Sequence, residues 1–249
     1  MILDERRERI LEVVEEKGFV SLHDLTSRFS ASESTVRRDL EYLDSIGQIR
    51  RTRGGAAYVG DSLTPFTDRV SINATQKQQI AKLAAGLVEP GEAVLLDGGT
   101  TTLEVARYLI GKPLQVVTNS LPIVNLLINQ PEIDLTVIGG YVHPKTGVAL
   151  GPQAVAALGN IHVRRLIMSV GGITERGLYN SNSLLVDTER QMIAAAEEVV
   201  VVADSEKLGH SALAHLCPLS DVDRCVVDSG VTDDWRRIFE EAHVELIIV

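Results

Sequence analysis

Seven short apolar runs, separated by stretches with helical periodicity, dominate the chain from residue 92 onward. Several of these runs are apolar at consecutive positions. A strand that is apolar on both faces has to be buried on both faces, as in a parallel sheet covered by helices. The runs are 93–96, 115–117, 135–138, 166–170, 199–203, 225–227 and 244–249. This part of the chain is therefore predicted to form a mostly parallel α/β domain.

Polar, glycine-rich segments follow five of the predicted strands. In open α/β sheets, ligands bind outside the carboxyl ends of the strands. Glycines allow close approach of the backbone, and the amides that open a predicted helix over 102–110 can hold an anion. The segments are Asp97-Gly98-Gly99-Thr100-Thr101-Thr102, Thr118-Asn119-Ser120, Gly139-Gly140, Gly171-Gly172 and Asp204-Ser205-Glu206-Lys207. A phosphate cradle is predicted here, since threonine hydroxyls accompany the glycines.

The other polar groups at these strand ends complete the predicted site. Lys207 supplies a counter-charge for the phosphate, while Asp204, Asp97 and Asn119 are left to bind sugar hydroxyls. Residues 179–183 add further hydroxyl partners. A single glycine-threonine turn is more often an ordinary connection, but five polar strand ends in one sheet favour a binding site. Neither a nucleotide P-loop nor a Gly-x-Gly-x-x-Gly pattern occurs, so a nucleotide is not indicated.

Three amphipathic helices are predicted in the first 58 residues. Val36, Leu40 and Leu43 fall on one narrow arc of a helix, and Ile10 with Val14 begins the same kind of pattern upstream. A middle helix carries Leu22, Leu25 and Phe29, and the serines at 21 and 32 are suitable N-caps. A helix, a short helix, a tight turn and an exposed helix make the helix-turn-helix plan.

A basic segment after the third helix predicts a small wing. Residues 48–58 contain Arg50, Arg51 and Arg53 and no acid, so the guanidinium groups can reach phosphates or a minor groove. The predicted DNA contacts are these three arginines with Ser32, Ser34, Thr35, Arg37 and Arg38.

Two acidic residues of the third helix need a different interpretation. Asp39 lies beside the apolar arc and is predicted to be a structural partner of an arginine such as Arg37 or a wing arginine. Glu41 could accept a hydrogen bond from a cytosine amine, although a position facing solvent is favoured.

The charge of the chain restricts where DNA can bind. The chain has 24 basic and 34 acidic residues, of which residues 1–58 hold 10 and 11. The remaining 14 basic and 23 acidic residues should repel DNA. Contact is therefore expected at the small domain alone, and specific binding should depend on dimeric half-sites.

Length and composition set the domain plan. We expect a winged helix-turn-helix domain over 1–58, a linker over 59–75 and an α/β effector-binding domain over 76–249. No apolar run approaches the roughly 18 residues of a membrane span, so the protein is expected in the cytoplasm without membrane contact. Two cysteines, Cys217 and Cys225, cannot complete a zinc site. No metal or cofactor is expected, and both thiols should be reduced.

Residues 4–58 resemble the amino-terminal domain of the DeoR family of bacterial sugar-responsive transcription regulators. The resemblance rests on Arg6, Ile10, residues 20–25, Ser34-Thr35-Val36-Arg37-Arg38-Asp39-Leu40, and Arg51 with Gly54-Gly55-Ala56. It continues through Pro65-Phe66, Arg69, Lys77 and the polar strand ends. The resemblance implies a winged helix that binds double-stranded operator DNA, usually as a repressor of a carbohydrate operon. It also implies a sensor domain with the ribose-5-phosphate isomerase fold that binds phosphorylated sugars.

Two functions follow from these patterns. The favoured one is a DNA-binding repressor that a phosphorylated sugar or sugar derivative releases, acting as a homodimer or homotetramer. The alternative is a sugar-phosphate isomerase-like or deaminase-like enzyme with a regulatory head. Such an enzyme needs a carboxylate base; Asp97 and Asp204 are available, but no acid-base pair stands out, so no catalytic residue is predicted. The sugar, the operator sequence and the sign of the effector's action are left open.

Overall fold

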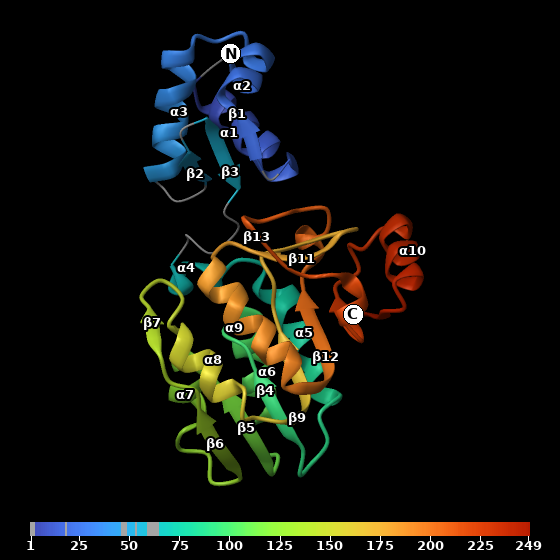
Figure 1. Ribbon diagram of the computed structural model, residues 1–249. Helices are drawn as coiled ribbons and strands as arrows, with labels where there is room; N and C mark the ends of the chain where they lie inside the picture. Colours follow the sequence, from blue (N-terminus) through green and yellow to red (C-terminus); the bar gives the residue numbers. More distant parts are fainter. Residues whose placement is uncertain (1–2, 18, 46–48, 53, 59–64) are drawn as a thin grey trace.

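Two units with separate hydrophobic cores make up the computed structural model of this chain (Figure 1). The structure describes residues 3–17, 19–45, 49–52, 54–58 and 65–249. Residues 59–64 of the expected linker lie outside the described residues. A short helix, α4 (Phe66–Val70), falls in the second part of that segment.

The amino-terminal unit contains the three helices that the apolar periodicity predicts. They are α1 (Leu3–Lys17), α2 (Leu22–Phe29) and α3 (Glu33–Ser45). The hydroxyl of Ser21 accepts a hydrogen bond from the amide of Asp24 at 3.0 Å, which confirms the predicted cap of α2. The buried faces of the three helices form one core around Ile10, Leu25 and Val36.

The wing has one strand more than the sequence predicts. Strands β2 (Ile49–Thr52) and β3 (Gly55–Tyr58) form the expected antiparallel hairpin, and β1 (Phe19–Ser21) adds a third strand in the order β1-β3-β2. A β-carbon on Gly55 would lie 2.1 Å from the carbonyl oxygen of Val20. The glycine therefore allows β1 to pair closely with β3. Because β1 forms through this pairing with residues far along the chain, the sequence around β1 does not predict it.

A seven-stranded sheet forms the centre of the larger unit. Its order is β15-β14-β12-β9-β4-β5-β6, and every pair of neighbours is parallel. The predicted mostly parallel α/β fold is therefore confirmed. The strands are β4 (Ala93–Leu96), β5 (Leu114–Thr118), β6 (Ile133–Val137), β9 (Val163–Met168), β12 (Ala196–Ala203), β14 (Arg224–Val227) and β15 (Glu245–Ile248).

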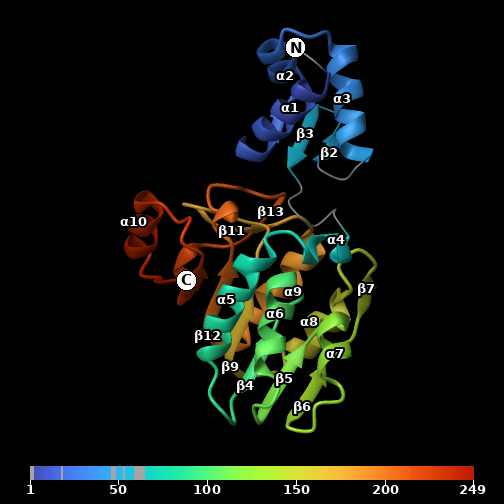
Figure 2. The ribbon, with the colours of Figure 1, turned by 180° about the vertical axis from the view of Figure 1, so that it is seen from behind.

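Helices cover both faces of this sheet (Figure 2). Helices α5 (Ala74–Gly86), α6 (Thr100–Leu109) and α7 (Leu121–Leu127) share one core with Val94 and Leu96. Leu95 points to the other face, where α8 (Pro152–Leu158), α9 (Ser183–Ala194) and α10 (Asp233–Glu241) pack. Consecutive residues of one strand thus enter two cores, which explains why the strands are apolar at successive positions.

Short elements that the sequence does not predict lie beyond the ends of the parallel strands. A hairpin consists of β7 (Tyr141–His143) and β8 (Val148–Leu150). A second sheet has the order β10-β11-β13 and comprises β10 (Gly172–Thr174), β11 (Gly177–Asn180) and β13 (Ala214–Cys217). Two 3₁₀ turns are η2 (Ser205–Lys207) and η3 (Leu219–Asp221).

Both cysteines are buried free thiols, as expected. Burial raises the pKa of Cys217 and of Cys225 to about 12. In the described part of the chain, no helix is long and apolar enough to cross a membrane.

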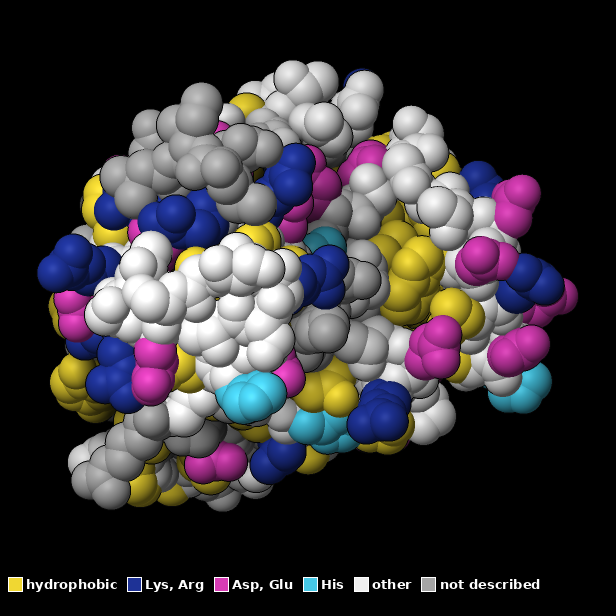
Figure 3. All heavy atoms as spheres, turned by 90° about the horizontal axis from the view of Figure 1, so that it is seen from above, with side chains coloured by type: hydrophobic (Ala, Val, Ile, Leu, Met, Phe, Trp, Pro, Cys, Tyr) yellow, Lys and Arg dark blue, Asp and Glu magenta, His cyan; other side chains and the backbone are white. Residues whose placement is uncertain are grey.

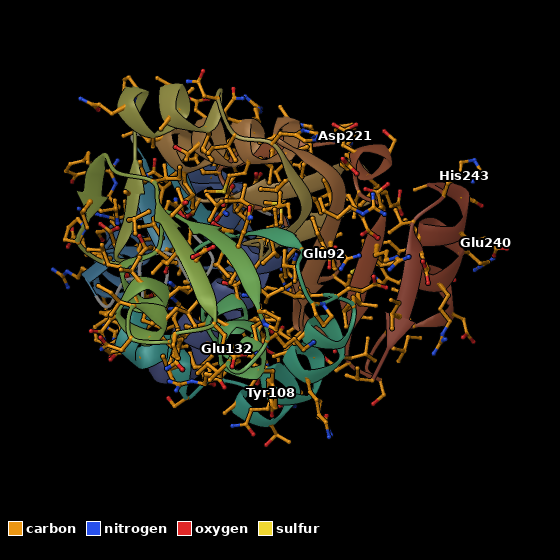
Figure 4. The ribbon with its side chains drawn as sticks, turned by 90° about the horizontal axis from the view of Figure 1, so that it is seen from below. Glu92, Tyr108, Glu132, Asp221, Glu240 and His243 are labelled. Carbon is orange, nitrogen blue, oxygen red and sulfur yellow. The ribbon has the colours of Figure 1, made fainter. Side chains whose placement is uncertain are left out.

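A buried ion network occupies the end of the sheet where the strands begin. The guanidinium of Arg165 contacts Glu92 at 3.0 Å and Glu198 at 2.7 Å, and Arg224 contacts Glu198 at 3.1 Å. Figure 4, seen from below, shows Glu92 at this end of the molecule. The network joins three neighbouring strands at the end opposite to the polar strand ends.

Candidate nucleic-acid interface and effector site

The amino-terminal end of α3 presents a group of hydroxyls to solvent. Ser32 and Ser34 are exposed, and Thr35 is half-buried. The Ser32 hydroxyl accepts a hydrogen bond from the Thr35 amide at 3.3 Å and lies 3.0 Å from Ser34 Oγ and 2.8 Å from Thr35 Oγ1. A recognition helix contacts base edges with its amino-terminal residues. The predicted cap is therefore also part of the surface that DNA would meet.

Basic residues of this surface are paired with neighbouring acids. Arg37 contacts Glu33 at 2.7 Å, and Arg51 of the wing contacts Glu41 at 2.6 Å, while Arg38 is exposed. Figure 3 shows the face of the molecule that carries this unit, where basic side chains alternate with acidic ones. Glu41 thus contacts a wing arginine.

Two of the predicted wing contacts involve side chains outside the described part of the structure. Arg50 belongs to strand β2, but its side chain is not among those described. Arg53 lies outside the described residues. Their proposed contacts to DNA remain predictions.

Asp39 is a structural residue, as predicted, but the predicted partner is wrong. Its carboxylate is buried and accepts hydrogen bonds from Arg6 at 2.5 Å and from Arg7 at 3.3 Å. The sequence prediction was Arg37 or a wing arginine. Arg37 instead lies beside Glu33, one helical turn away. Because α1 packs against α3, Arg6 and Arg7 near the start of α1 come to lie beside Asp39.

In the larger unit, one pocket lies at the carboxyl ends of β9 and β12. We call it the cationic pocket, because it contains three basic side chains and one carboxylate, for a formal charge of two positive. The basic residues come from α4, α5 and η2, and two threonines come from the first turn of α6. Its lining residues are Arg69, Lys77, Thr100, Thr101, Ser169, Val170, Val202, Ala203, Asp204 and Lys207.

A second pocket adjoins the first and shares Arg69, Ser169 and Val170 with it. We call it the carboxyl pocket, because two buried acids line it, Asp97 after β4 and Glu189 of α9. Its other lining residues are Gly98, Thr146, Gly171, Asn180 and Leu185.

The two buried acids have strongly altered pKa values. Burial raises the pKa of Asp97 to about 6, against the opposing effects of the backbone N–H groups of Gly98 and Ser169 and of the Arg69 charge. Burial and the nearby Asp97 raise the pKa of Glu189 well above its usual range. Perturbed carboxyl groups in a cavity are typical of binding or catalytic sites.

The loop that carries Lys207 is held in place from the neighbouring strand. After β14, the carboxylate of Asp228 accepts hydrogen bonds from the Ser205 amide and the Ser205 hydroxyl at 2.7 Å each. It also accepts one from the Gly230 amide at 2.9 Å. Asp228 therefore fixes the first residue of η2, two positions before Lys207.

About half of the predicted effector residues meet in these two pockets. Seven of them line one pocket or the other: Asp97, Gly98, Thr100, Thr101, Gly171, Asp204 and Lys207. Eight line neither pocket: Gly99, Thr102, Thr118, Asn119, Ser120, Gly139, Gly140 and Gly172. No ligand contact has been observed for any of them, so all fifteen assignments remain predictions.

Packing explains why the other strand ends do not reach the pockets. Strand β8 covers the end of β5, where the Asn119 side-chain amide donates to the Ala149 carbonyl at 2.9 Å. Thr102 caps its own helix by accepting from the Gly99 amide at 2.7 Å. Gly139 and Gly140 are exposed after the edge strand β6.

The glycines after β4 also have a packing role that the sequence did not indicate. A β-carbon on Gly98 would lie 1.9 Å from Val148 Cγ1, and one on Gly99 would lie 2.0 Å from Ser169 Oγ. Neighbouring protein segments thus leave little room for a side chain at either position.

Several lining residues were not among the predicted effector contacts, including Arg69, Lys77, Ser169 and Glu189. Arg69 and Lys77 fall in the stretch that resembles the DeoR family, so the resemblance offered a signal for them. Ser169 and Glu189 reach the site only through the fold.

Comparison with known proteins covers nearly the whole chain. Residues 6–61 match the DeoR-like helix-turn-helix domain, and residues 72–229 match the DeoR C terminal sensor domain. The uncharacterized HTH-type transcriptional regulator YgbI of Escherichia coli K12 is 34% identical, covering 100% of this chain and 98% of that protein. A candidate aga operon transcriptional repressor of E. coli O157:H7 is also 34% identical, covering 98% and 93%. The HTH-type transcriptional regulator UlaR of E. coli K12/DH10B is 29% identical, covering 98% of each.

The chain also shows similarity to solved structures. Ribose 5-phosphate isomerase A of Methanocaldococcus jannaschii matches with a TM-score of 0.41 and 21% identity, over 55% of each chain.

Proposed function

This chain belongs to the DeoR family of DNA-binding transcriptional regulators, and we propose that it represses a carbohydrate-metabolism operon until a phosphorylated sugar or sugar derivative binds its larger unit. It regulates transcription and is not an enzyme, since relatives matched over almost their full length are named as transcriptional regulators. One relative is named as a candidate repressor, which supports repression for this chain.

The charge of the cationic pocket carries the effector proposal. Three basic side chains and Asp204 leave a formal charge of two positive around a small polar space. A phosphate monoester carries about −1.5 to −2 at neutral pH and offers three acceptor oxygens. The first-turn amides of α6 and the hydroxyls of Thr100 and Thr101 add donors at a helix N-terminus, where anions bind favourably.

The adjoining carboxyl pocket supports a sugar phosphate over free phosphate. Because the two pockets share Arg69, Ser169 and Val170, a ligand with its phosphate among the cations can extend toward Asp97 and Asn180. Carboxylate and amide groups are suitable partners for sugar hydroxyls. We therefore place the phosphate in the cationic pocket and the carbon chain in the carboxyl pocket.

For DNA, we propose that the exposed end of α3 enters the major groove. Ser32, Ser34, Thr35, Arg37 and Arg38 would face base edges and nearby phosphates, while Arg50, Arg51 and Arg53 would reach the backbone or the minor groove. The division into 1–58, 59–75 and 76–249 is part of the same proposal, as are a location in the cytoplasm and an even number of subunits on a two-fold operator.

A salt-controlled binding measurement tests this function. The full-length protein is titrated onto the promoter DNA upstream of its operon, with and without a panel of sugar phosphates. We expect Arg38→Ala to weaken operator binding at least tenfold, and Lys207→Met to bind operator normally but to lose the response to the sugar phosphate. If the wild-type protein bound no promoter DNA, or if no sugar phosphate changed its binding, the proposal would be abandoned.

A further inference from the structure

The carboxyl pocket holds two buried oxygens that have no hydrogen-bond partner among the described residues. They are Oδ1 of Asp97 and Oε2 of Glu189, and both residues line the same cavity. Buried polar atoms in a folded protein are nearly always satisfied by protein or by water, so an unsatisfied pair facing a cavity points to a partner held in that cavity. An ionised carboxylate oxygen can only accept a hydrogen bond, whereas a protonated one can donate.

The surroundings of Asp97 favour a role as hydrogen-bond acceptor. Backbone N–H groups of Gly98 and Ser169 donate to its carboxylate, and the positive charge of Arg69 lies nearby. Because Oδ1 has no partner, those backbone hydrogen bonds fall on the other oxygen. Donors of this kind favour the ionised form of the carboxyl group, which leaves Oδ1 as a charged acceptor directed at the cavity.

The hydrogen bonds around Glu189 favour a role as hydrogen-bond donor. The amide of Ser181 donates to Asn180 Oδ1 at 3.1 Å, and this fixes the orientation of the Asn180 side chain. Its Nδ2 then donates to Glu189 Oε1 at 2.8 Å. With Oε1 accepting, a proton on the glutamic acid has to be on Oε2, the oxygen that has no partner.

The environment of Glu189 favours its neutral form. An ionised carboxylate with a single hydrogen bond is costly to bury, and a second negative charge at Asp97 raises that cost. The raised pKa of Glu189, caused by burial and by Asp97, agrees with this assignment. The pair therefore holds one proton, and it is carried by Glu189.

We propose that Glu189 and Asp97 together bind one hydroxyl group of the effector's carbon chain, with Glu189 Oε2–H donating to the hydroxyl oxygen and the hydroxyl donating to Asp97 Oδ1. This inference rests on the proposed function, because the phosphate has to occupy the cationic pocket. A hydroxyl is the simplest group that both accepts and donates at one atom. The effector is accordingly a polyhydroxylated phosphate that has this hydroxyl free.

The arrangement discriminates against two related classes of ligand. A deoxy analogue leaves both buried oxygens unpaired, which a hydrogen-bonding site penalises heavily. A protonated amine has no lone pair to accept the proton of Glu189, so an amino-sugar phosphate should also bind poorly. Both analogues keep the phosphate and should lose affinity only through the carboxyl pocket.

Two amide variants test the assignment with opposite expected results. In Glu189→Gln the new side-chain amide can still donate to the ligand while its oxygen accepts from Asn180, so affinity should stay within about fivefold of wild type. In Asp97→Asn the backbone donors hold the amide oxygen, so the amide N–H₂ faces the ligand and the hydroxyl proton of the ligand loses its acceptor. Affinity should then fall by about a hundredfold.

The measurement is calorimetric titration of the full-length protein with inorganic phosphate, glucose 6-phosphate, fructose 6-phosphate, ribose 5-phosphate and sorbitol 6-phosphate. The best ligand is compared with its deoxy and amino analogues. We expect at least one of these sugar phosphates to bind a hundredfold more tightly than inorganic phosphate, and inorganic phosphate to bind both variants as it binds wild type, which shows that they fold.

The outcomes separate the two proposals. If neither phosphate nor any sugar phosphate binds, the proposed effector site fails, and this inference fails with it. If phosphate binds but no sugar phosphate binds more tightly, the hydroxyl site alone is overturned. The same holds if Glu189→Gln loses as much affinity as Asp97→Asn, or if the amino analogue binds as well as the parent sugar phosphate.

Discussion

Asp39 supports the predicted DNA-binding surface from inside the amino-terminal unit, where its side chain is buried. Its side chain is 1% exposed and joins α3 to Arg6 and Arg7 at the start of α1. Removing one member of a buried ion pair is costly because the partner charges lose their compensation. The sequence motif around positions 34–40 therefore combines groups that would read DNA with one that supports the helix from behind.

We expect Asp39→Ala to lower the free energy of unfolding of the amino-terminal unit by about 3 kcal/mol. Urea unfolding, followed by circular dichroism, measures the change. Glu33→Ala is the matched control, because it removes the exposed partner of Arg37 and should cost less than about 1 kcal/mol. Equal losses in the two variants would contradict the structural role of Asp39.

At the scale of elements, the site depends on short turns that are anchored by neighbouring strands. Asp228, after β14, holds η2 and so positions Lys207. Burial acts to raise the pKa of Asp228, but hydrogen bonds from Ser205 and Gly230 outweigh it and hold the pKa below its ordinary value. An acid with a lowered pKa in the folded state stabilises the fold above its unfolded pKa.

The sign of this effect gives a pH prediction. The contribution of Asp228 should be complete above the unfolded pKa of about 3.9 and should disappear as the pH falls through the folded value. At pH 7 we expect Asp228→Asn to be less stable than wild type by about 1–3 kcal/mol. The difference, measured by thermal unfolding, should shrink as the pH is lowered below about 4.

A control at an exposed position isolates the effect of Asp228. Asp134→Asn replaces an exposed acid on the edge strand β6 and should change stability by less than about 0.5 kcal/mol. A stability difference for Asp228→Asn that does not depend on pH would show that its carboxylate charge plays no part.

Elements with a strong local pattern were predictable from the sequence, and elements defined by distant contacts were not. The central strand β4 has the predicted bounds, and β12 starts three residues earlier than predicted. Strand β8 has only three residues. It forms where the chain packs over the end of β5 and Val148 pairs with Ser120. For the same reason the sequence identified polar strand ends but not which of them meet, since that depends on strand order and on what packs over each end.

At the scale of the whole molecule, the segment that begins the larger unit borders both pockets. Arg69 lines both pockets, and it lies on α4, the first described helix after the amino-terminal unit. The amide of Phe66 donates to the Lys145 carbonyl at 2.9 Å, and the Asn73 side chain donates to Glu206 at 2.9 Å. Residues 65–77 are therefore attached to two loops that border the pockets.

Because these contacts tie the segment to the loops beside the pockets, we predict that it couples effector binding to DNA binding. The coupling between two sites is a free energy, commonly equivalent to a 5-fold to 150-fold change in affinity. An interaction that transmits it can be removed without removing either binding site. Asn73 and Glu206 meet this condition, because neither residue lines the cationic or the carboxyl pocket and neither belongs to the predicted DNA-binding surface.

We expect Asn73→Gly and Glu206→Ala each to reduce this coupling about fivefold. Asn73 has a φ of 50°, which glycine adopts readily, so the substitution deletes the hydrogen bond without straining the backbone. Operator affinity without effector, and effector affinity without DNA, should each stay within about threefold of wild type. The ratio of operator dissociation constants with and without saturating sugar phosphate should fall, and the reciprocal effect of operator on effector binding should fall by the same factor.

Glu206→Gln is the matched control, since its amide oxygen still accepts from Asn73 and the wild-type ratio should be retained. This control also separates the hydrogen bond from the charge next to Lys207. If both Asn73→Gly and Glu206→Ala kept the wild-type ratio, coupling would have to pass elsewhere, and Arg69 itself would be the next position to test. If Glu206→Gln lost coupling as fully as Glu206→Ala, the charge of Glu206 would be the cause and the hydrogen bond to Asn73 would not.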